Sequence, residues 1–186
     1  MATSVDKQSF NLALFPESKQ FIDETIKLAQ NNFASQSQEY LLGDNAWPHI
    51  TLCQFSAEPS RLNEIWTAVS PLATKPLSIR LSQFYIWLYE NAYWMGLGTM
   101  REPELISLQF AVYETLNTLG ITANQKPSNY FPHITWARCG GDKPPTISIL
   151  PNPEFWFQSH SFALSLGQSS PYGVYQKRLL PAEISK

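Results

Sequence analysis

The sequence has 186 residues, of which 44% are hydrophobic and only 15% charged, so it predicts one globular domain and argues against a disordered chain or two full-size domains. Its 13 basic and 15 acidic residues give a net charge of −2, which argues against a surface that grips a long nucleic acid or an anionic membrane. Cys53 and Cys139 lie 139 − 53 = 86 residues apart, a spacing that fits neither a metal motif nor a disulfide framework. We therefore expect two free thiols.

The chain shows no pattern typical of secretion or membrane insertion. Its first 30 residues have no basic segment followed by an uninterrupted apolar stretch. The most apolar stretch, 84–97, is interrupted by Glu90 and Asn91 and is shorter than the roughly 20 residues that span a bilayer. We expect a cytoplasmic, monomeric protein with no membrane partner.

The first half of the chain predicts strand, helix, strand and helix. The apolar run 10–15 has the length of a strand, and Pro16 is suited to open the following helix. A polar loop is expected over 35–45, then a strand after Pro48 and a helix with Ser60 as its N-cap. The residues expected on the buried face of the first helix are Phe21, Thr25, Leu28, Ala29 and Asn32.

The second half predicts two pairs of strands around a helix and one further strand. Its expected elements are strands 77–89 and 93–98, a helix from Pro103 that stops at Gly120, a strand after Phe131, and strands 162–167 and 174–180. This order is typical of an α+β fold in which helices lie outside mainly antiparallel sheets. We expect one two-lobed domain over 1–186, with approximate halves 1–76 plus the C-terminal strands, and 77–186.

One tetrapeptide, Pro-His-Ile-Thr, occurs twice, at 48–51 and at 132–135. Each copy follows an aromatic residue and leads into an apolar strand. A single His-x-Thr is uninformative, but a chance repeat of any tetrapeptide in such a chain has a probability on the order of 0.1, and the shared context lowers it further. The structural alternative is an internal duplication in which the tetrapeptide is retained for packing alone.

The repeated motif suits displacement at phosphorus. Side chains alternate along a strand, so His49 and Thr51 share one face, as do His133 and Thr135. If the two strands meet in a pseudo-twofold arrangement, the four polar groups line one cleft. Two histidines can then accept and donate protons near neutral pH, while threonine hydroxyls donate to the phosphate oxygens. This scheme requires neither a metal nor a cofactor.

These motifs resemble those of the two-histidine (2H) phosphoesterases, the LigT-like or 2′-5′ RNA ligase family. The family signature, two His-x-Thr/Ser motifs in a duplicated two-lobed fold, is matched at 49–51 and 133–135, with 133 − 49 = 84 residues between the histidines. The resemblance implies hydrolysis of a 2′,3′-cyclic phosphate or a 2′-5′ linkage, and it favours His49 as the acid and His133 as the base. It also suggests Arg138 as a substrate-binding residue, although strict alternation turns Arg138 away from Thr135 unless the strand bulges.

Several other residues have both a functional and a structural interpretation. Aromatic side chains at 85, 87 and 89, with those at 93 and 94 across the expected turn, could stack a nucleobase or fill the core. Alternation would place Cys53 on the face of His49 and Thr51, where it could serve as a nucleophile, yet a thiol on an apolar strand is more often inert. His160 lacks the companion hydroxyl and is expected at the surface or a strand edge. Lys177 and Arg178 are the basic residues expected nearest to an anion.

The sequence therefore predicts a metal-independent cyclic phosphodiesterase. Its catalytic residues would be His49, Thr51, His133 and Thr135, and its substrate a small nucleotide or an RNA end that carries a cyclic phosphate. The same chemistry on a 2′-5′ linkage or on a cyclic phosphate of ADP-ribose is an alternative. An alternative of another class is a nucleotide- or RNA-end-binding module that does not turn over.

Overall fold

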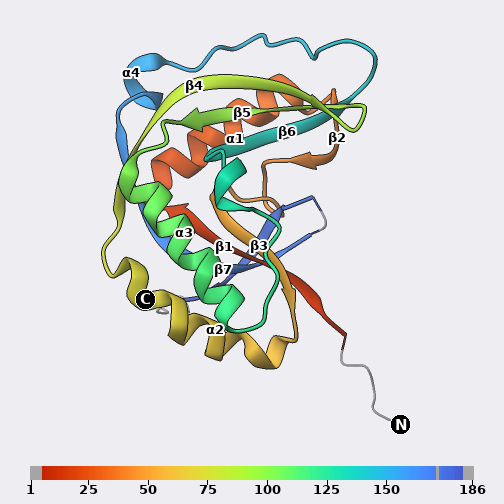
Figure 1. Cartoon of the computed structure of the whole chain (residues 1–186). Coiled ribbons are helices and arrows are strands. Elements are labelled where there is room, and N and C mark those ends of the chain that lie inside the picture. Colours follow the sequence, from red (N-terminus) through yellow and green to blue (C-terminus); the bar gives the residue numbers. More distant parts are fainter. Residues whose placement is uncertain (1–5, 171, 182–186) are drawn as a thin grey trace.

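The computed structural model describes residues 6–170 and 172–181, which form an α+β domain as expected (Figure 1). The elements are β1 (Gln8–Pro16), α1 (Lys19–Phe33), β2 (Ser37–Leu41), β3 (Ile50–Ala57), α2 (Leu62–Val69), β4 (Leu77–Tyr89), β5 (Ala92–Thr99), α3 (Pro103–Thr118), β6 (His133–Gly140), α4 (Pro153–Trp156), β7 (Ser159–Ser169) and β8 (Tyr175–Leu180).

The strands form one antiparallel sheet with the order β2-β6-β5-β4-β7-β1-β3, and β8 also pairs with β7. The long strand β4 joins the two lobes, because its first residues, Leu77–Arg80, pair with β7 while the segment from Leu81 onward pairs with β5. Strands β3 and β6, which carry the two motifs, stand near opposite ends of this order but lie close together in space. The curvature of the sheet therefore brings the two motifs to one place.

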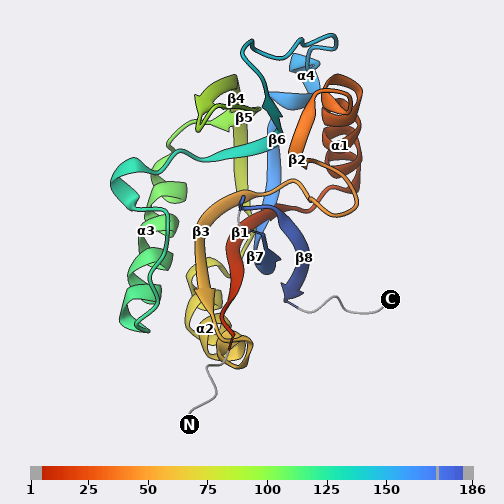
Figure 2. The same ribbon diagram turned by 90° about the vertical axis from the view of Figure 1, so that its right-hand side faces the viewer.

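The two lobes repeat one unit, a strand, a helix and an antiparallel motif strand. The unit β1-α1-β3 in one lobe corresponds to β5-α3-β6 in the other. Helix α1 packs against β6 and helix α3 against β3, so each helix contacts the motif strand of the other lobe. Figure 2 shows the two helices on opposite outer flanks of the strands, in agreement with the expected pseudo-twofold fold.

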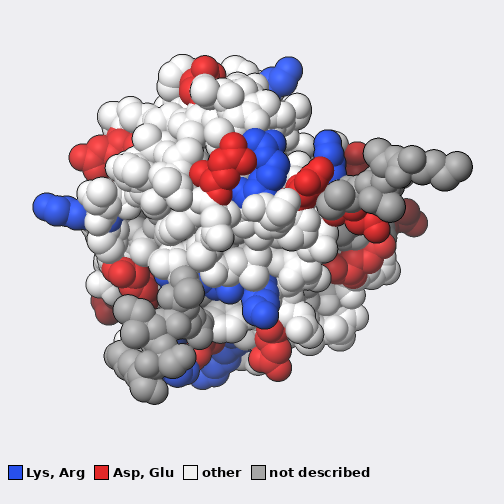
Figure 3. Space-filling model, turned by 90° about the horizontal axis from the view of Figure 1, so that it is seen from below, with Lys and Arg blue, Asp and Glu red and all other residues white. Residues whose placement is uncertain are grey.

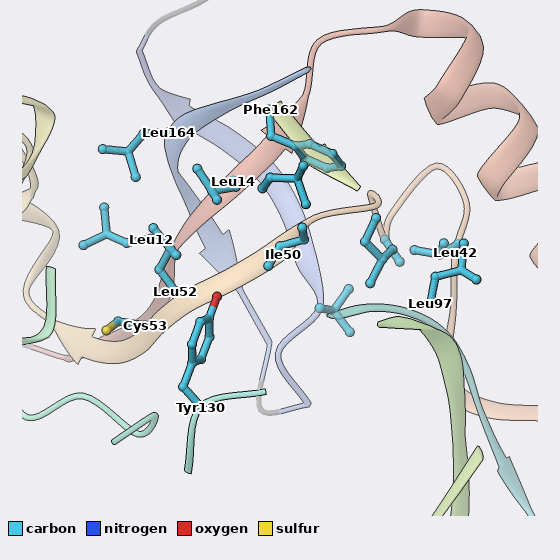
Figure 4. Packing of buried hydrophobic residues seen from close by; sticks show 14 of the residues in the cluster. Leu12, Leu14, Leu42, Ile50, Leu52, Cys53, Leu97, Tyr130, Phe162 and Leu164 are labelled. Carbon is cyan, nitrogen blue, oxygen red and sulfur yellow. The ribbon is translucent and has the colours of Figure 1, made fainter. Parts of the chain in front are cut away.

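The hydrophobic core extends across both lobes and packs against the inner face of the motif strands. Ile50, Leu52 and Cys53 of β3 are fully buried. Figure 4 shows these side chains beside Leu12 of β1, with Tyr130 directed towards the same strand. The motif strands are thus held from behind by apolar packing.

Most of the predicted elements are confirmed. All five residues expected on the buried face of the first helix are buried in α1. The predicted hairpin 77–98 is present, and its turn residues Glu90 and Asn91 have φ values of 50° and 59°, the left-handed conformation that a two-residue hairpin turn needs. Gly120, with φ of 70°, follows α3 as expected.

Three local predictions are wrong. Pro16 ends β1, and α1 begins at Lys19 after Ser18, whose side chain accepts a hydrogen bond from the Phe21 amide. The predicted loop 35–45 contains the edge strand β2, which alternation does not reveal because only Tyr40 is buried and Glu39 has a φ of 65°. Ser60 lies in a short 3-10 turn that precedes α2 rather than at its N-cap.

One face of the molecule carries scattered charge. On the face drawn in Figure 3, acidic and basic side chains are interspersed among uncharged ones. None of the helices in the described ranges is long and apolar enough to cross a membrane.

We predict that Gly96→Ala strongly destabilises the fold, because Gly96 lets β5 approach β6 closely. A Cβ there would lie 1.9 Å from the backbone oxygen of Ile134 and 2.9 Å from the Tyr85 hydroxyl. We expect a loss of about 3 kcal/mol in the free energy of unfolding, measured by chemical denaturation.

Gly43→Ala is the matched control. A Cβ at Gly43 would meet only the Gln30 side-chain nitrogen, at 3.0 Å, and a flexible side chain can move away. Equal losses of stability in the two variants would show that close strand approach at Gly96 is not what the fold requires.

Candidate active site

A cleft of about 570 Å³ lies where the two motif strands face each other. It contains all four residues that the sequence singled out, His49, Thr51, His133 and Thr135. The other residues that line it are Tyr40, Gln54, Trp87, Trp94, Asn124, Gln125, Lys126, Asn129, Tyr130, Phe131, Tyr172 and Gly173.

Both histidines are anchored in the same way. The Nδ1 atom of His49 lies 2.8 Å from the Trp47 carbonyl oxygen, and Nδ1 of His133 lies 2.7 Å from the Phe131 carbonyl oxygen. A carbonyl oxygen only accepts, so each Nδ1 carries the proton and donates it. In the neutral ring the lone pair is therefore on Nε2, the atom available for proton transfer.

His49 is buried between an aromatic ring and an amide. Its ring lies 5.1 Å from the Tyr175 ring, and its Nε2 atom is 3.5 Å from Nδ2 of Asn11. Burial is the main cause that lowers the pKa of His49 to about 4, and the nearby His133 lowers this pKa further. His49 is therefore neutral at pH 7 in the free protein.

His133 is surrounded by aromatic rings. Phe131 stacks on it with ring centroids 5.3 Å apart, Tyr85 meets it edge-on at 5.2 Å, and Trp87 lies at 5.8 Å. Burial lowers the pKa of His133, while its hydrogen bond to the Phe131 carbonyl opposes that change. Of the five aromatics considered from the sequence, Tyr85 and Trp87 contact His133, and Trp94 also lines the cleft.

The two threonines differ in their partners. The Thr135 hydroxyl lies 3.0 Å from the Tyr85 hydroxyl, which is buried and whose pKa is raised by burial. Thr51 has no side-chain hydrogen bond to any described residue, although it lines the same cleft. Both hydroxyls can donate to an oxygen of a bound anion.

Each motif strand bulges directly after its threonine. In β3 the pairing with β1 shifts so that Thr51 and Cys53 oppose consecutive residues of β1, which leaves Leu52 as the extra residue. In β6 the same shift leaves Trp136 extra. A bulge reverses the alternation of side chains beyond it. Two successive apolar residues therefore enter the core in each strand. The next residue, Gln54 in β3 and Arg138 in β6, faces the cleft side.

Arg138 therefore lies on the face that strict alternation excluded, but it stands beside the cleft rather than in it. Its guanidinium forms a salt bridge with Glu39 and lies over the rings of Trp94 and Tyr172, at 5.8 and 5.2 Å from their centroids. Both aromatic residues line the cleft. In this structure Arg138 supports the cleft wall.

Three other sequence interpretations are resolved by burial and position. The bulge places the Cys53 side chain in the core, so it does not lie beside Thr51. Burial raises the pKa of its thiol to about 12. His160 is buried against the Phe21 ring rather than lying at the surface, with its Nε2 2.8 Å from the Phe155 carbonyl oxygen. Lys177 and Arg178 do not line the cleft.

Sequence reasoning missed several polar residues of the site, among them Lys126, Gln54 and Asn11. Lys126, in the loop before β6, is the charged residue that lines the cleft within the described part of the chain. Gln54 lines it through the bulge, and buried Asn11 reaches His49 from β1. Binding residues often lie in loops, and this general tendency is the only signal in the sequence that could have indicated Lys126.

Among residues 6–170 and 172–181, no group of three or more His, Cys, Asp or Glu side chains is placed to hold a metal ion. Both cysteines are free and buried, as the sequence predicts for their bonding state. The groups that the cleft offers to a ligand are imidazoles, hydroxyls, amides, one ammonium and aromatic faces.

No family model matches the chain, and no curated protein matches it. Solved structures do. The structure of Escherichia coli LigT complexed with 3′-AMP has a TM-score of 0.64 and 19% identity over 89% of this chain and 90% of that chain. A phosphoesterase structure has a TM-score of 0.65 and 18% identity over 94% and 96% of the two chains. These likenesses show that the chain has the LigT-like phosphoesterase fold.

We predict that the protein loses stability as the pH falls from about 6.5 towards 4. His49 has a folded-state pKa of about 4 and an unfolded pKa near 6.5, so the unfolded chain binds more protons in this window. The full difference corresponds to about 3 kcal/mol at most. The free energy of unfolding, measured by denaturation at a series of pH values, should fall with this sign.

The variant His49→Gln should give a flatter pH dependence over the same window, because the buried titrating group is gone. His133 and His160, whose pKa values are also lowered by burial, account for the remaining slope. A slope identical to that of the unmodified protein would contradict the assignment to His49.

Proposed function

We propose that the protein is a metal-independent cyclic phosphodiesterase that hydrolyses a 2′,3′-cyclic phosphate on a small nucleotide or an RNA end. The observation that carries the proposal is the matched pair of histidines, each with Nδ1 fixed on a backbone carbonyl and Nε2 left for proton transfer in one cleft. Such a pair serves an in-line displacement, in which one oxygen enters and another leaves on opposite sides of phosphorus.

In the proposed reaction a water molecule attacks phosphorus while one histidine removes its proton at Nε2. The bond from phosphorus to the 2′ or 3′ oxygen breaks, and the other histidine protonates that oxygen, so a phosphate monoester results. The acid must carry its proton before the reaction, and burial alone disfavours this. The negative charge of a bound phosphate favours the imidazolium and so restores the required protonation state.

The phosphate oxygens would be held by Thr51, Thr135 and Lys126. The hydroxyls follow the histidines by two residues on the same strand face, which places each beside its imidazole. Lys126 adds a positive charge at the cleft wall. Charge on the phosphate increases in its equatorial oxygens during displacement, so these donors stabilise the transition state.

The nucleoside part of the substrate would lie against the aromatic wall. Trp87 is 44% exposed and its ring lies 4.5 Å from that of Phe131, so a flat face beside His133 is open to a ligand. Stacking of a base on such a face contributes about 1 to 3 kcal/mol. Among the structures with this fold, LigT is described in complexes with 3′-AMP, NADP+ and ATP, which supports a nucleotide as the ligand class.

Two alternatives use the same cleft. A 2′-5′ phosphodiester or a cyclic phosphate of ADP-ribose would undergo the same displacement with a different leaving group. A binding module would hold the nucleotide without turnover. Assays with 2′,3′-cyclic mononucleotides, cyclic-ended RNA, 2′-5′ dinucleotides and ADP-ribose cyclic phosphate separate these possibilities, and binding without hydrolysis of any of them would favour the module.

We predict that His49→Gln and His133→Gln each lower kcat by about 100-fold or more, the effect expected for removing a positioned acid or base. The measurement is the initial rate of hydrolysis of the best substrate from the panel, in the presence of excess chelator.

His160→Gln is the matched control, because His160 is also buried and hydrogen-bonded to a carbonyl but lies outside the cleft. It should retain near wild-type activity where it remains folded. Loss of activity on chelation that a divalent ion restores would contradict the metal-independent mechanism, and full activity of either cleft variant would contradict the two-histidine mechanism.

We predict a shallow salt dependence and little preference for long RNA. With 13 basic and 15 acidic residues and one ammonium lining the cleft, about one to three phosphates should be engaged, and log K falls with log salt at about −0.7 per phosphate for single strands. We would measure kcat/KM for a cyclic mononucleotide, a trimer and a long cyclic-ended RNA at several salt concentrations.

Similar kcat/KM values for the trimer and the long RNA are the expected result. A steep salt slope combined with a strong preference for the long RNA would instead indicate an extended binding surface outside the cleft.

A further inference from the structure

Asn11 is a buried polar residue at the back of the candidate site. It stands in β1 directly opposite Gln54 of β3 and is fully buried. Its Nδ2 atom lies 3.0 Å from the Gly173 carbonyl oxygen and 3.5 Å from Nε2 of His49, while its Oδ1 atom has no hydrogen-bond partner among the described residues. The Asn11 nitrogen thus lies between the Gly173 carbonyl oxygen and Nε2 of His49.

The orientation of the Asn11 amide is fixed by its neighbours. If the amide were turned over, its oxygen would face the Gly173 carbonyl oxygen, and two acceptors would oppose each other. The nitrogen therefore points to Gly173 and His49, with one hydrogen for each. An N–H directed at Nε2 is favourable only when that atom carries a lone pair.

The Gly173 carbonyl favours the protonated ring and so raises the pKa of His49, but Asn11 donates to that oxygen and faces Nε2 with its other N–H. The Asn11 amide therefore favours the neutral ring. The Nδ1 atom of His49 donates to the Trp47 carbonyl, and its Nε2 faces a donor. A proton on Nε2 would turn this contact into an opposition of two N–H groups. At 3.5 Å the contact is long, so a water molecule or substrate oxygen can replace it during a reaction.

Among residues 6–170 and 172–181, no side-chain amide is hydrogen-bonded to the second histidine, His133. Asn11 opposes Gln54 in one lobe, and at the equivalent place in the other lobe Trp94 opposes Arg138. The ring of His133 instead contacts Phe131, Tyr85 and Trp87. The duplicated fold therefore gives the two histidines different surroundings at this position.

We propose that Asn11 is a positioning residue that holds His49 as the neutral Nδ1–H tautomer and thereby gives the two histidines different proton affinities. This role rests on the proposed function, in which His49 is a catalytic residue. The contact between Asn11 and His49 is present in the protein without substrate. The ionisable groups in contact with His49 or acting on its charge are His133 across the cleft and the Tyr175 phenol of β8, whose hydroxyl donates to Ser165. No described carboxylate, lysine or arginine forms an ion pair with His49.

The experiment is an NMR titration of the two imidazoles in the free protein. In the unmodified protein we expect the nitrogen shifts of His49 to report the Nδ1–H tautomer and its midpoint to lie below that of His133. In Asn11→Asp a carboxylate replaces the amide and accepts a proton-bearing Nε2, so the His49 midpoint should rise by about one pH unit, a tenfold gain in proton affinity, and by more than that of His133.

Two matched variants separate positioning from general loosening of the fold. Asn11→Leu keeps the approximate volume but has neither donor nor charge, so its His49 midpoint should move less than in Asn11→Asp. Gln54 also ties the β7–β8 turn, through its Nε2 at 3.0 Å from the Ser170 carbonyl oxygen, but no hydrogen bond joins it to His49. Gln54→Leu should therefore leave the His49 midpoint near that of the unmodified protein.

The pH profile of kcat/KM gives the functional reading. In Asn11→Asp the apparent pKa of the limb that belongs to His49 should rise. This limb is the acid limb if His49 is the base, and the alkaline limb if His49 is the acid. An Nε2–H tautomer in the unmodified protein, coincident titration of the two histidines, or equal shifts of both in Asn11→Asp would overturn the proposal. The tautomer measurement needs no variant, and shifted midpoints in an inactive protein would remove the proposed function while leaving this inference intact.

Discussion

The hydrogen bond from each histidine Nδ1 to the carbonyl two residues earlier is the contact on which the candidate site depends. It explains why proline precedes the histidine in both motifs, since proline fixes its own φ and keeps the residue before it extended. The carbonyl of that residue then meets the imidazole at the start of the strand. One local contact thus favours the same tautomer in both rings, and the proposed role of Asn11 adds a second contact at His49 alone.

The bulges that follow the threonines determine both which residues pack in the core and which residue faces the cleft. The core receives Leu52 and Cys53 in one lobe and Trp136 and Ala137 in the other, which anchors each motif strand by two adjacent apolar side chains. The residue after each pair returns to the cleft side. Because the two lobes place different residues there, duplication of the fold has not produced two identical half-sites.

Helices and strands with a strong hydrophobic period could be predicted from the sequence. The convergence of the two motifs could also be predicted, because an identical tetrapeptide in two equivalent strands implies a pseudo-twofold cleft. The edge strand β2 could not, since its burial comes from pairing with β6 and its own residues are polar. The position of Cys53 was predicted wrongly because alternation cannot reveal a bulge. Lys126 and Asn11 enter the site through tertiary contacts that no local pattern records.

The different walls of the cleft constrain how any ligand with one flat apolar end can bind. The wall beside His133 has Trp87 and Phe131, whose rings offer stacking surface. The wall beside His49 has the Gln54 amide and the Gly173 backbone, which offer hydrogen bonds instead. A flat group placed against the Gln54 amide and the Gly173 backbone would cover polar atoms that water otherwise satisfies, at a cost of about 1 to 3 kcal/mol for each group left unpaired. On the proposed function, a nucleotide in this cleft would therefore lie with its base towards the stacking surface beside His133.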